Sequence, residues 1–249
     1  MVENEKPKSS TTDAAPRKFQ GALVVVAHPD DPEFLFGAAV AHLVNNGTIV
    51  TYVICTDGAN GSRDPAVPAA QITSTRYEEQ RAAAHLLGVS DVACLGFPDG
   101  LLAPTGALRM AIAREIRRYR PELVLTHYPR RVLEIPMEAS HPDHLAAGEA
   151  ALSAVSPDAG NIRAFPQLLE EGLQPHRVNE VWVAGHERPN HFIDASPFLD
   201  LKIQAILCHR SQFSTAENPE PPPWIYHWMK WAGSKVGCEY AESYTRIAM

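Results

Sequence analysis

ALVVVAHPDD, residues 22–31, is the stretch that decides the fold of this chain. Its first six residues are apolar, with three consecutive valines, which is typical of a strand buried on both faces, as in parallel sheets. A histidine and two aspartates, His28, Asp30 and Asp31, follow directly. Open parallel sheets bind their ligands beyond the carboxyl ends of the strands. The stretch therefore predicts a parallel sheet with a polar site at the end of its first strand.

Outward from this strand, apolar strand-like runs alternate with helical patterns. Strands are expected at residues 48–56, 91–95, 122–126 and 180–184, and helices at residues 33–46, 73–87, 108–119, 144–154 and 199–212. Such alternation is typical of βαβ units and of a mostly parallel sheet with helices on both faces. The predicted fold class is therefore α/β, in a Rossmann-like arrangement.

The remaining segments are interpreted as an extension and loops. Residues 1–19 are polar and rich in Lys, Ser, Thr and Pro, so we expect a disordered N-terminal extension before a single domain at residues 20–249. Residues 127–140 and the proline-rich residues 217–224 interrupt the alternation and are predicted to be loops. The first of these loops either shapes a substrate pocket or simply connects two elements.

Composition excludes several classes of protein. Of the 249 residues, 45% are hydrophobic and 20% charged, as in ordinary globular proteins, and the net charge of −7 argues against a nucleic-acid binder. No apolar run is long enough for a membrane span or a signal peptide. The four cysteines are scattered without a C-x-x-C pair, which argues against disulfides or a cysteine zinc site and fits a reducing cytoplasm. A homo-oligomer stays possible.

A second polar cluster, His141-Pro-Asp143-His144, opens the predicted helix after the fourth strand. Taken alone, the first cluster could be a solvated turn, and the second a capped helix start. In doubly wound sheets, however, the first and fourth strands are natural neighbours, which brings the two clusters together. Two histidines and a carboxylate with open positions form a catalytic zinc set, and the same set can hold Fe²⁺. Spacing alone leaves open which side chains bind metal and which move protons.

The paired motifs resemble those of the PIG-L/LmbE-like de-N-acetylases. Further similar positions are Arg76-x-x-Glu79, the GFPDG run at residues 96–100, and Lys202 ahead of the HRSQ run at residues 209–212. The resemblance covers about residues 21–212. It implies a zinc enzyme that removes acetyl groups from N-acetylglucosaminyl compounds and related amides.

Carried over position by position, the resemblance implies three groups of site residues. The metal ligands would be His28, Asp31 and His144. Asp30 would be the base, His141 would stabilise or protonate the transition state, and Asp143 would support the histidine beside it. Arg76 and Asp99 would contact the sugar. Where the family often has Glu directly after the second Asp, this chain has Pro32 before Glu33, so no role is carried over for Glu33.

Weaker alternatives remain for the outlying positions. Arg76 is otherwise an ordinary ion-paired helix residue, and Asp99 lies in a run that also fits a turn. Residues 56–61, TDGANG, either line the site or turn the chain, and they do not match a dinucleotide-binding fingerprint.

The expected function is metal-dependent hydrolysis of an N-acyl, above all N-acetyl, amide on an amino sugar or other small glycoconjugate. A metal would polarise the carbonyl and acidify its bound water, Asp30 would take the proton, and His141 would stabilise the oxyanion and protonate the amine. One alternative is an amidase that acts on a thiol–sugar conjugate. Another is a metal-free binding protein on the same fold, although the intact His/Asp set argues against it.

Overall fold

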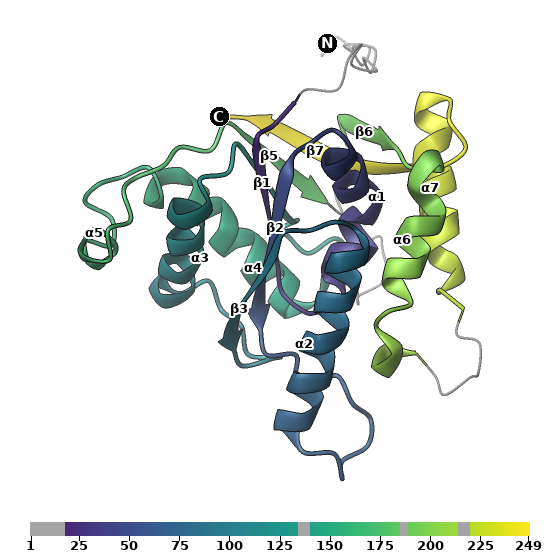
Figure 1. Ribbon diagram of the computed structural model, residues 1–249, viewed down its shortest axis with the longest axis horizontal. Coiled ribbons are helices and arrows are strands. Elements are labelled where there is room, and N and C mark those ends of the chain that lie inside the picture. The colour runs from purple at the N-terminus through teal and green to yellow at the C-terminus, as the bar shows by residue number, and fades with distance from the viewer. Residues whose placement is uncertain (1–17, 134–139, 185–188, 214–219) are drawn as a thin grey trace, which may run out of the picture.

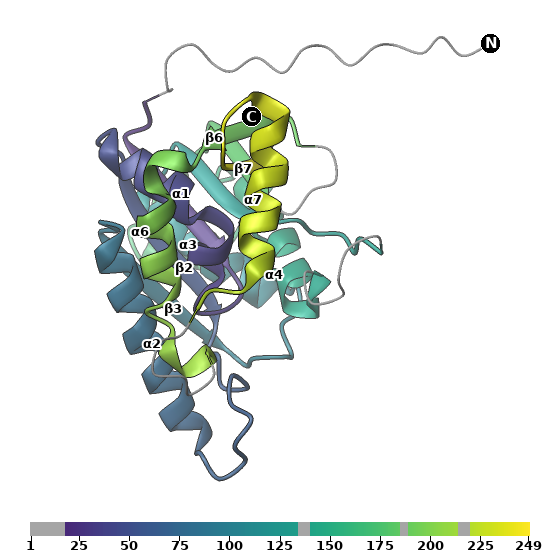
Figure 2. The same ribbon diagram turned by 90° about the vertical axis from the view of Figure 1, so that its right-hand side faces the viewer.

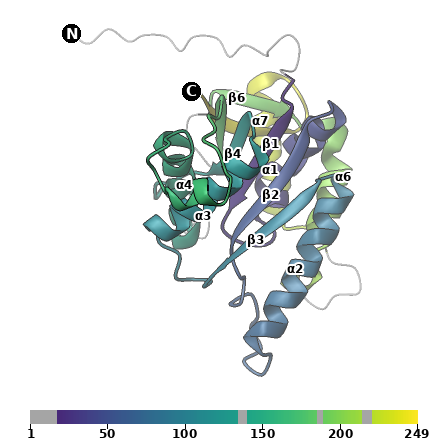
Figure 3. The ribbon, with the colours of Figure 1, turned by 60° about the vertical axis from the view of Figure 1, so that its left-hand side comes forward.

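The computed structural model describes residues 18–133, 140–184, 189–213 and 220–249. Within these residues, the strands form one seven-stranded sheet in the order β3-β2-β1-β4-β5-β7-β6 (Figures 1 and 3). The strands are β1 (Gly21–Val26), β2 (Ile49–Thr56), β3 (Asp91–Phe97), β4 (Leu123–His127), β5 (Glu180–Ala184), β6 (His191–Asp194) and β7 (Ala241–Ala248). The strands β1 to β5 pair in parallel, whereas β7 pairs antiparallel with both β5 and β6. The α/β, mostly parallel fold predicted from the sequence is confirmed.

Helices cover both faces of this sheet, as Figure 1 shows. They are α1 (Asp31–Asn45), α2 (Ala69–Leu86), α3 (Gly106–Tyr119), α4 (Pro142–Ser153), α5 (Gln167–Glu170), α6 (Leu199–Ile206) and α7 (Pro223–Val236), with short helical turns at Ala154–Asp158, Ser196–Phe198 and Arg210–Gln212. Val24 and Val26 of β1 face the core shared with α1, α2 and α6, while Leu23 and Val25 face the core shared with α3 and α4. All four side chains are fully buried, which explains the uninterrupted apolar run.

A buried ion pair contacts the backbone in the middle of α1. The carboxylate of Glu242, on β7, accepts hydrogen bonds from the backbone N–H groups of Ala38 and Ala39. In a regular helix the Ala38 N–H would bond to the carbonyl oxygen of Phe34. That oxygen also accepts from Lys202 Nζ of α6, and Lys202 pairs with Glu242. The pair therefore fixes the helix that carries Asp31 against α6 and β7.

The C-terminal part of the chain differs from the sequence-based prediction. The predicted helix at residues 199–212 ends at Ile206. Residues 217–219 of the predicted loop lie outside the described residues, and its last two residues, Pro223 and Trp224, already belong to α7. Proline is well suited to the first turn of a helix, because that turn has no partner for its N–H groups. Buried Ile225 and Met229 dock α7 beside α6 (Figure 2). The short strand β6, the strand β7 and the single-turn α5 were not predicted.

Several expectations concern residues at the edges of the described structure. Residues 1–17 of the expected extension lie outside the described residues, as do residues 134–139 of the loop before the second motif. Phe19 is already buried, packs edge-to-face on Trp182, and accepts a hydrogen bond from the Thr48 hydroxyl. Among the described helices, none is long and apolar enough to cross a membrane.

Candidate active site

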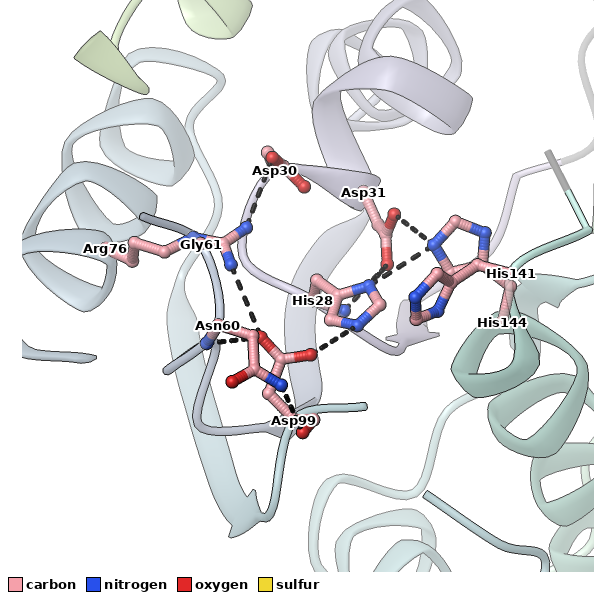
Figure 4. Close-up of a pocket in the computed structure, with 9 residues that line it drawn as sticks. All are labelled: His28, Asp30, Asp31, Asn60, Gly61, Arg76, Asp99, His141 and His144. Carbon is pink, nitrogen blue, oxygen red and sulfur yellow. Dashed lines mark hydrogen bonds and ion pairs between the residues drawn. The ribbon is translucent and has the colours of Figure 1, made fainter. Parts of the chain in front are cut away.

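The two motifs meet at the carboxyl ends of the adjacent strands β1 and β4, where the strand order reverses. A pocket of about 290 Å³ opens there (Figure 4). Its lining residues are His28, Asp30, Asp31, Asn60, Gly61, Arg76, Asp99, His141 and His144. Asn60 and Gly61 belong to the TDGANG run, which therefore lines the pocket as well as turning the chain. This is the place where doubly wound sheets bind their ligands.

Three side chains converge on one point of this pocket. His28 Nδ1 lies 3.3 Å from His144 Nε2 and 3.6 Å from Asp31 Oδ2, and His144 Nε2 lies 3.1 Å from Asp31 Oδ1. Ligands bound to tetrahedral zinc at about 2.0–2.2 Å stand about 3.3–3.6 Å from one another. The spacing and the donor types of these three residues therefore fit a zinc-sized ion.

The far side of the His28 ring is held by two carboxylates. His28 Nε2 lies 3.1 Å from Asp99 Oδ1 and 3.2 Å from Asp143 Oδ2. Asp143 is itself fixed by the backbone N–H groups of Gly100 and Leu102, at 2.7 and 3.1 Å. A carboxylate on one ring nitrogen leaves the other nitrogen, here Nδ1, free to bind a metal, and it also orients the ring.

The charge balance at His28 shows how strongly the site favours a cation. Burial opposes protonation of His28, but Asp143, Asp31 and Asp99 outweigh it and raise the pKa of His28 to about 12. Carboxylates gathered at this density need a positive charge among them, because unpaired buried charge is costly. A divalent ion beside neutral histidines would supply that charge, so the residues present fit a metal.

His127 is a site residue that the sequence analysis missed, because it was assigned to a loop. It is the last residue of β4 and is buried, with Nε2 at 3.1 Å from Asp31 Oδ2. Its ring stacks on His144, with 4.3 Å between ring centroids and 9° between planes. His127 therefore fixes both the carboxylate and one histidine of the converging set. A histidine ending a buried strand next to β1 was the signal that could have revealed it.

Asp30 lies beside Asp31 without joining the converging set. Arg76 Nη2 approaches the Asp30 carboxylate at 3.3 Å. Burial raises the pKa of Asp30 to about 6, with Arg76 opposing the shift and Asp31 adding to it. A carboxylate with a pKa near neutrality is suited to taking a proton and giving it back.

His141 caps α4 with its own side chain. Its Nδ1 accepts a hydrogen bond from the backbone N–H of Asp143 at 3.2 Å, so the neutral ring carries its proton on Nε2. Burial and the neighbouring His28 and His144 lower the pKa of His141, which favours this neutral form. The Asp143 carboxylate turns to His28 of the other motif, whereas the resemblance implied that it would support the histidine beside it.

Known proteins are similar to this chain in both sequence and fold. The sequence profile of PIG-L, described as GlcNAc-PI de-N-acetylase, matches residues 23–155. The chain belongs to the PIG-L family. It is 33% identical over 220 residues to diacetylchitobiose deacetylase of Thermococcus kodakarensis, covering 88% of this chain and 80% of that protein. It is 28% identical over 205 residues to a probable N-acetyl-alpha-D-glucosaminyl L-malate deacetylase 2 of Bacillus anthracis, covering 78% and 81%.

A solved PIG-L relative also shares the fold. The crystal structure of N,N'-diacetylchitobiose deacetylase from Pyrococcus horikoshii with an inhibitor superimposes with a TM-score of 0.84 and 26% identity. The alignment covers 92% of this chain and 84% of that one. The likeness therefore extends well beyond the two motifs, as the resemblance from sequence had implied.

The site brings together all eight residues to which the resemblance assigned a ligand, proton-transfer or sugar-contact role. Of these, Asp143 alone is absent from the pocket lining of the described structure, since it lies buried behind His28. Arg76 and Asp99 face the pocket, and both also make hydrogen bonds to the backbone around it. Arg76 donates to the carbonyl oxygens of Gly58 and Pro29, and Asp99 accepts from the Asn60 N–H.

Proposed function

We propose that this PIG-L chain is a zinc-dependent hydrolase that removes the acetyl group from the nitrogen of an N-acetylated amino sugar. The observation that carries the proposal is the convergence of His28, Asp31 and His144 at zinc-ligand spacing, with the Asp30 carboxylate beside them. Fe²⁺ is the alternative metal, because two histidines and a carboxylate also suit it. When bound, the metal would polarise the amide carbonyl and acidify water.

The proton chemistry is assigned to Asp30. Its carboxylate takes a proton from the attacking water, and its acid form returns the proton to the nitrogen that leaves as an amine. That proton is needed because an amide anion is a very poor leaving group. A pKa of about 6 allows Asp30 to serve in both directions at neutral pH.

His141 is assigned to the developing oxyanion alone. The acid role that the resemblance also implied for it is assigned to Asp30, because the lowered pKa of His141 favours a neutral ring. Because Nδ1 is engaged by the backbone, the ring offers its Nε2–H to the pocket as a hydrogen-bond donor. A donor fixed by a helix cap is already oriented before reaction, which is how oxyanion stabilisation gains its strength. Asp143 contributes by orienting His28 rather than by touching the reacting atoms.

The substrate is inferred from the pocket and the named relatives. Relatives acting on diacetylchitobiose and on N-acetylglucosaminyl malate support an N-acetylglucosamine unit as the acyl-bearing sugar. Asp99 and Arg76, which face the pocket, are proposed to contact its hydroxyl groups. An Asp99 oxygen has a second lone pair left after its bond to His28 or Asn60, so it can still accept from a sugar.

A panel of substrates tests this proposal. Purified chain would be assayed for free amine released from N,N'-diacetylchitobiose, N-acetylglucosamine, N-acetylglucosaminyl malate and an N-acylated thiol–sugar conjugate. Amine from the acetylated sugars is expected, with much less from the thiol conjugate. Preference for the thiol conjugate would indicate the amidase alternative. A chain that binds these sugars without releasing amine, with or without Zn²⁺, would be the metal-free binding protein.

A further inference from the structure

The peptide unit between Pro29 and Asp30 is held at both of its polar atoms. Arg76 Nη2 donates to the Pro29 carbonyl oxygen at 2.6 Å, and the Asp30 N–H donates to Gln80 Oε1 at 2.8 Å. Arg76 and Gln80 are four residues apart on α2, so they project from one face of that helix. One face of α2 therefore holds the peptide unit that precedes the proposed base, Asp30.

This grip acts on a strained residue. Asp30 has φ 100° and ψ −32°, outside the regions that residues with a Cβ prefer. Strained residues of this kind persist only where the surrounding structure fixes them, and they cluster at functional sites. The strain sets the direction of the Asp30 side chain. Release of the peptide would let φ relax and would turn the carboxylate away from its place beside Asp31.

The Gln80 side-chain amide is in turn oriented by Glu33. Its Nε2 donates to both oxygens of Glu33, at 3.0 and 3.1 Å, so its oxygen must face Asp30. His209 Nε2 lies 3.0 Å from Glu33 Oε2. Gln80, Glu33 and His209 are all fully buried, and they come from α2, from α1 and from the turn between α6 and the helical turn Arg210–Gln212. A buried carboxylate needs such partners, and here they also fix which way the amide points.

We propose that Gln80, Glu33 and His209 form a positioning relay for the base Asp30: His209 holds Glu33, Glu33 orients the Gln80 amide, and Gln80 holds the Asp30 N–H. The relay rests on the proposed function of Asp30. It also gives a role to Glu33, which the family resemblance left without one.

If the three residues form a relay, each hydrogen bond in it must run from a donor to an acceptor in one fixed direction. Packing alone would not require this. Gln80→Glu places a carboxylate against Glu33, so two acceptors face each other where a donor met an acceptor. Adding Glu33→Gln restores complementarity. The new amide at position 33 donates to the new carboxylate and accepts from His209, while the second oxygen at position 80 accepts the Asp30 N–H. Volumes are conserved throughout, so only the direction of the hydrogen bonds changes.

The experiment compares four proteins with the parent as zinc-loaded enzymes. Gln80→Glu is expected to lower kcat for N,N'-diacetylchitobiose about a hundredfold, as for a group misplaced by about 1 Å, with little change in KM and full metal content. The double variant Gln80→Glu/Glu33→Gln should recover at least about tenfold of that loss. Gln80→Leu, which removes both bonds without adding charge, should lower kcat about tenfold to a hundredfold. Thr48→Val, which removes a buried hydrogen bond at the opposite end of the sheet, should keep the parent kcat.

A double variant no faster than Gln80→Glu, or a Gln80→Leu enzyme with the parent kcat, would overturn the relay. If Gln80→Glu does not fold, Gln80→Leu decides the matter. An inactive parent would count against the proposed function instead. In that case, a crystal structure of Gln80→Leu still tests the relay: it predicts that φ of Asp30 relaxes to negative values, and an unchanged positive φ would contradict it.

Discussion

Lys202→Met is expected to destabilise the protein strongly, although Lys202 lies outside the pocket. The Lys202 side chain is 2% exposed and that of Glu242 is 4% exposed. Removing one partner of a buried ion pair leaves an uncompensated charge and costs about 3–5 kcal/mol. The Phe34 carbonyl oxygen also loses the lysine as a donor, while the methionine still fills the space of the lysine stem. The helix N–H groups of Ala38 and Ala39 continue to solvate Glu242, so the lower half of that range is the expected loss.

Urea unfolding followed by circular dichroism measures this loss directly. Thermal unfolding should show Tm lowered by roughly 6–16 °C, at about 2–4 °C per kcal/mol for a chain of this size. The matched control is Arg114→Met. It breaks a bidentate pair with Glu171 whose side chains are 26% and 41% exposed, so the expected loss is much smaller than that of Lys202→Met. Equal losses of stability in the two variants would refute this account of the buried ion pair.

Three further predictions concern the site. Cys55→Ala should keep full metal and activity, because the buried thiol is not a ligand; loss of metal there would contradict the ligand assignment. Asp30→Asn should keep the metal but lose about a hundredfold to ten-thousandfold in kcat. The kcat/KM of the parent should fall below about pH 6, where the Asp30 carboxylate is protonated, and this fall should be absent in the variant. A variant that keeps the parent's fall at low pH would refute Asp30 as the base. Glu33 raises the pKa of His209 in the folded protein, against the effect of burial. The stability that His209 contributes is therefore complete below its pKa of 6.5 in the unfolded chain, and it is lost as the pH rises through the higher pKa of the folded state. The Tm difference between the parent and His209→Gln should therefore shrink from pH 6 to pH 9, and a constant difference would contradict this linkage.

The fold was predictable because its signals are local. The apolar run that becomes β1 and the helical patterns between the strands specify βαβ units, and the doubly wound order of such units places the ends of β1 and β4 side by side. That rule alone brought His28 and His144 together across the sequence. The late elements gave weaker signals: β6 is short and polar, and the prolines before α7 mark a helix start that looks like a loop.

The contacts that organise the site could not be predicted from the sequence. His127 meets Asp31 only through the register of two strands, and Glu33, Gln80 and His209 meet only once α1, α2 and the turn after α6 have packed. No periodicity links residues so far apart in the chain. The turn of the Asp143 carboxylate toward His28 likewise depends on the Gly100 and Leu102 amides of a distant loop.

The central claim is that His28, Asp31 and His144 hold the catalytic metal. Metal bound per chain, measured by inductively coupled plasma mass spectrometry after dialysis against limiting Zn²⁺, tests it most directly. The account predicts one equivalent in the parent protein and almost none in His144→Ala, with both chains equally folded by circular dichroism. A folded His144→Ala protein that retains the parent metal content would contradict it.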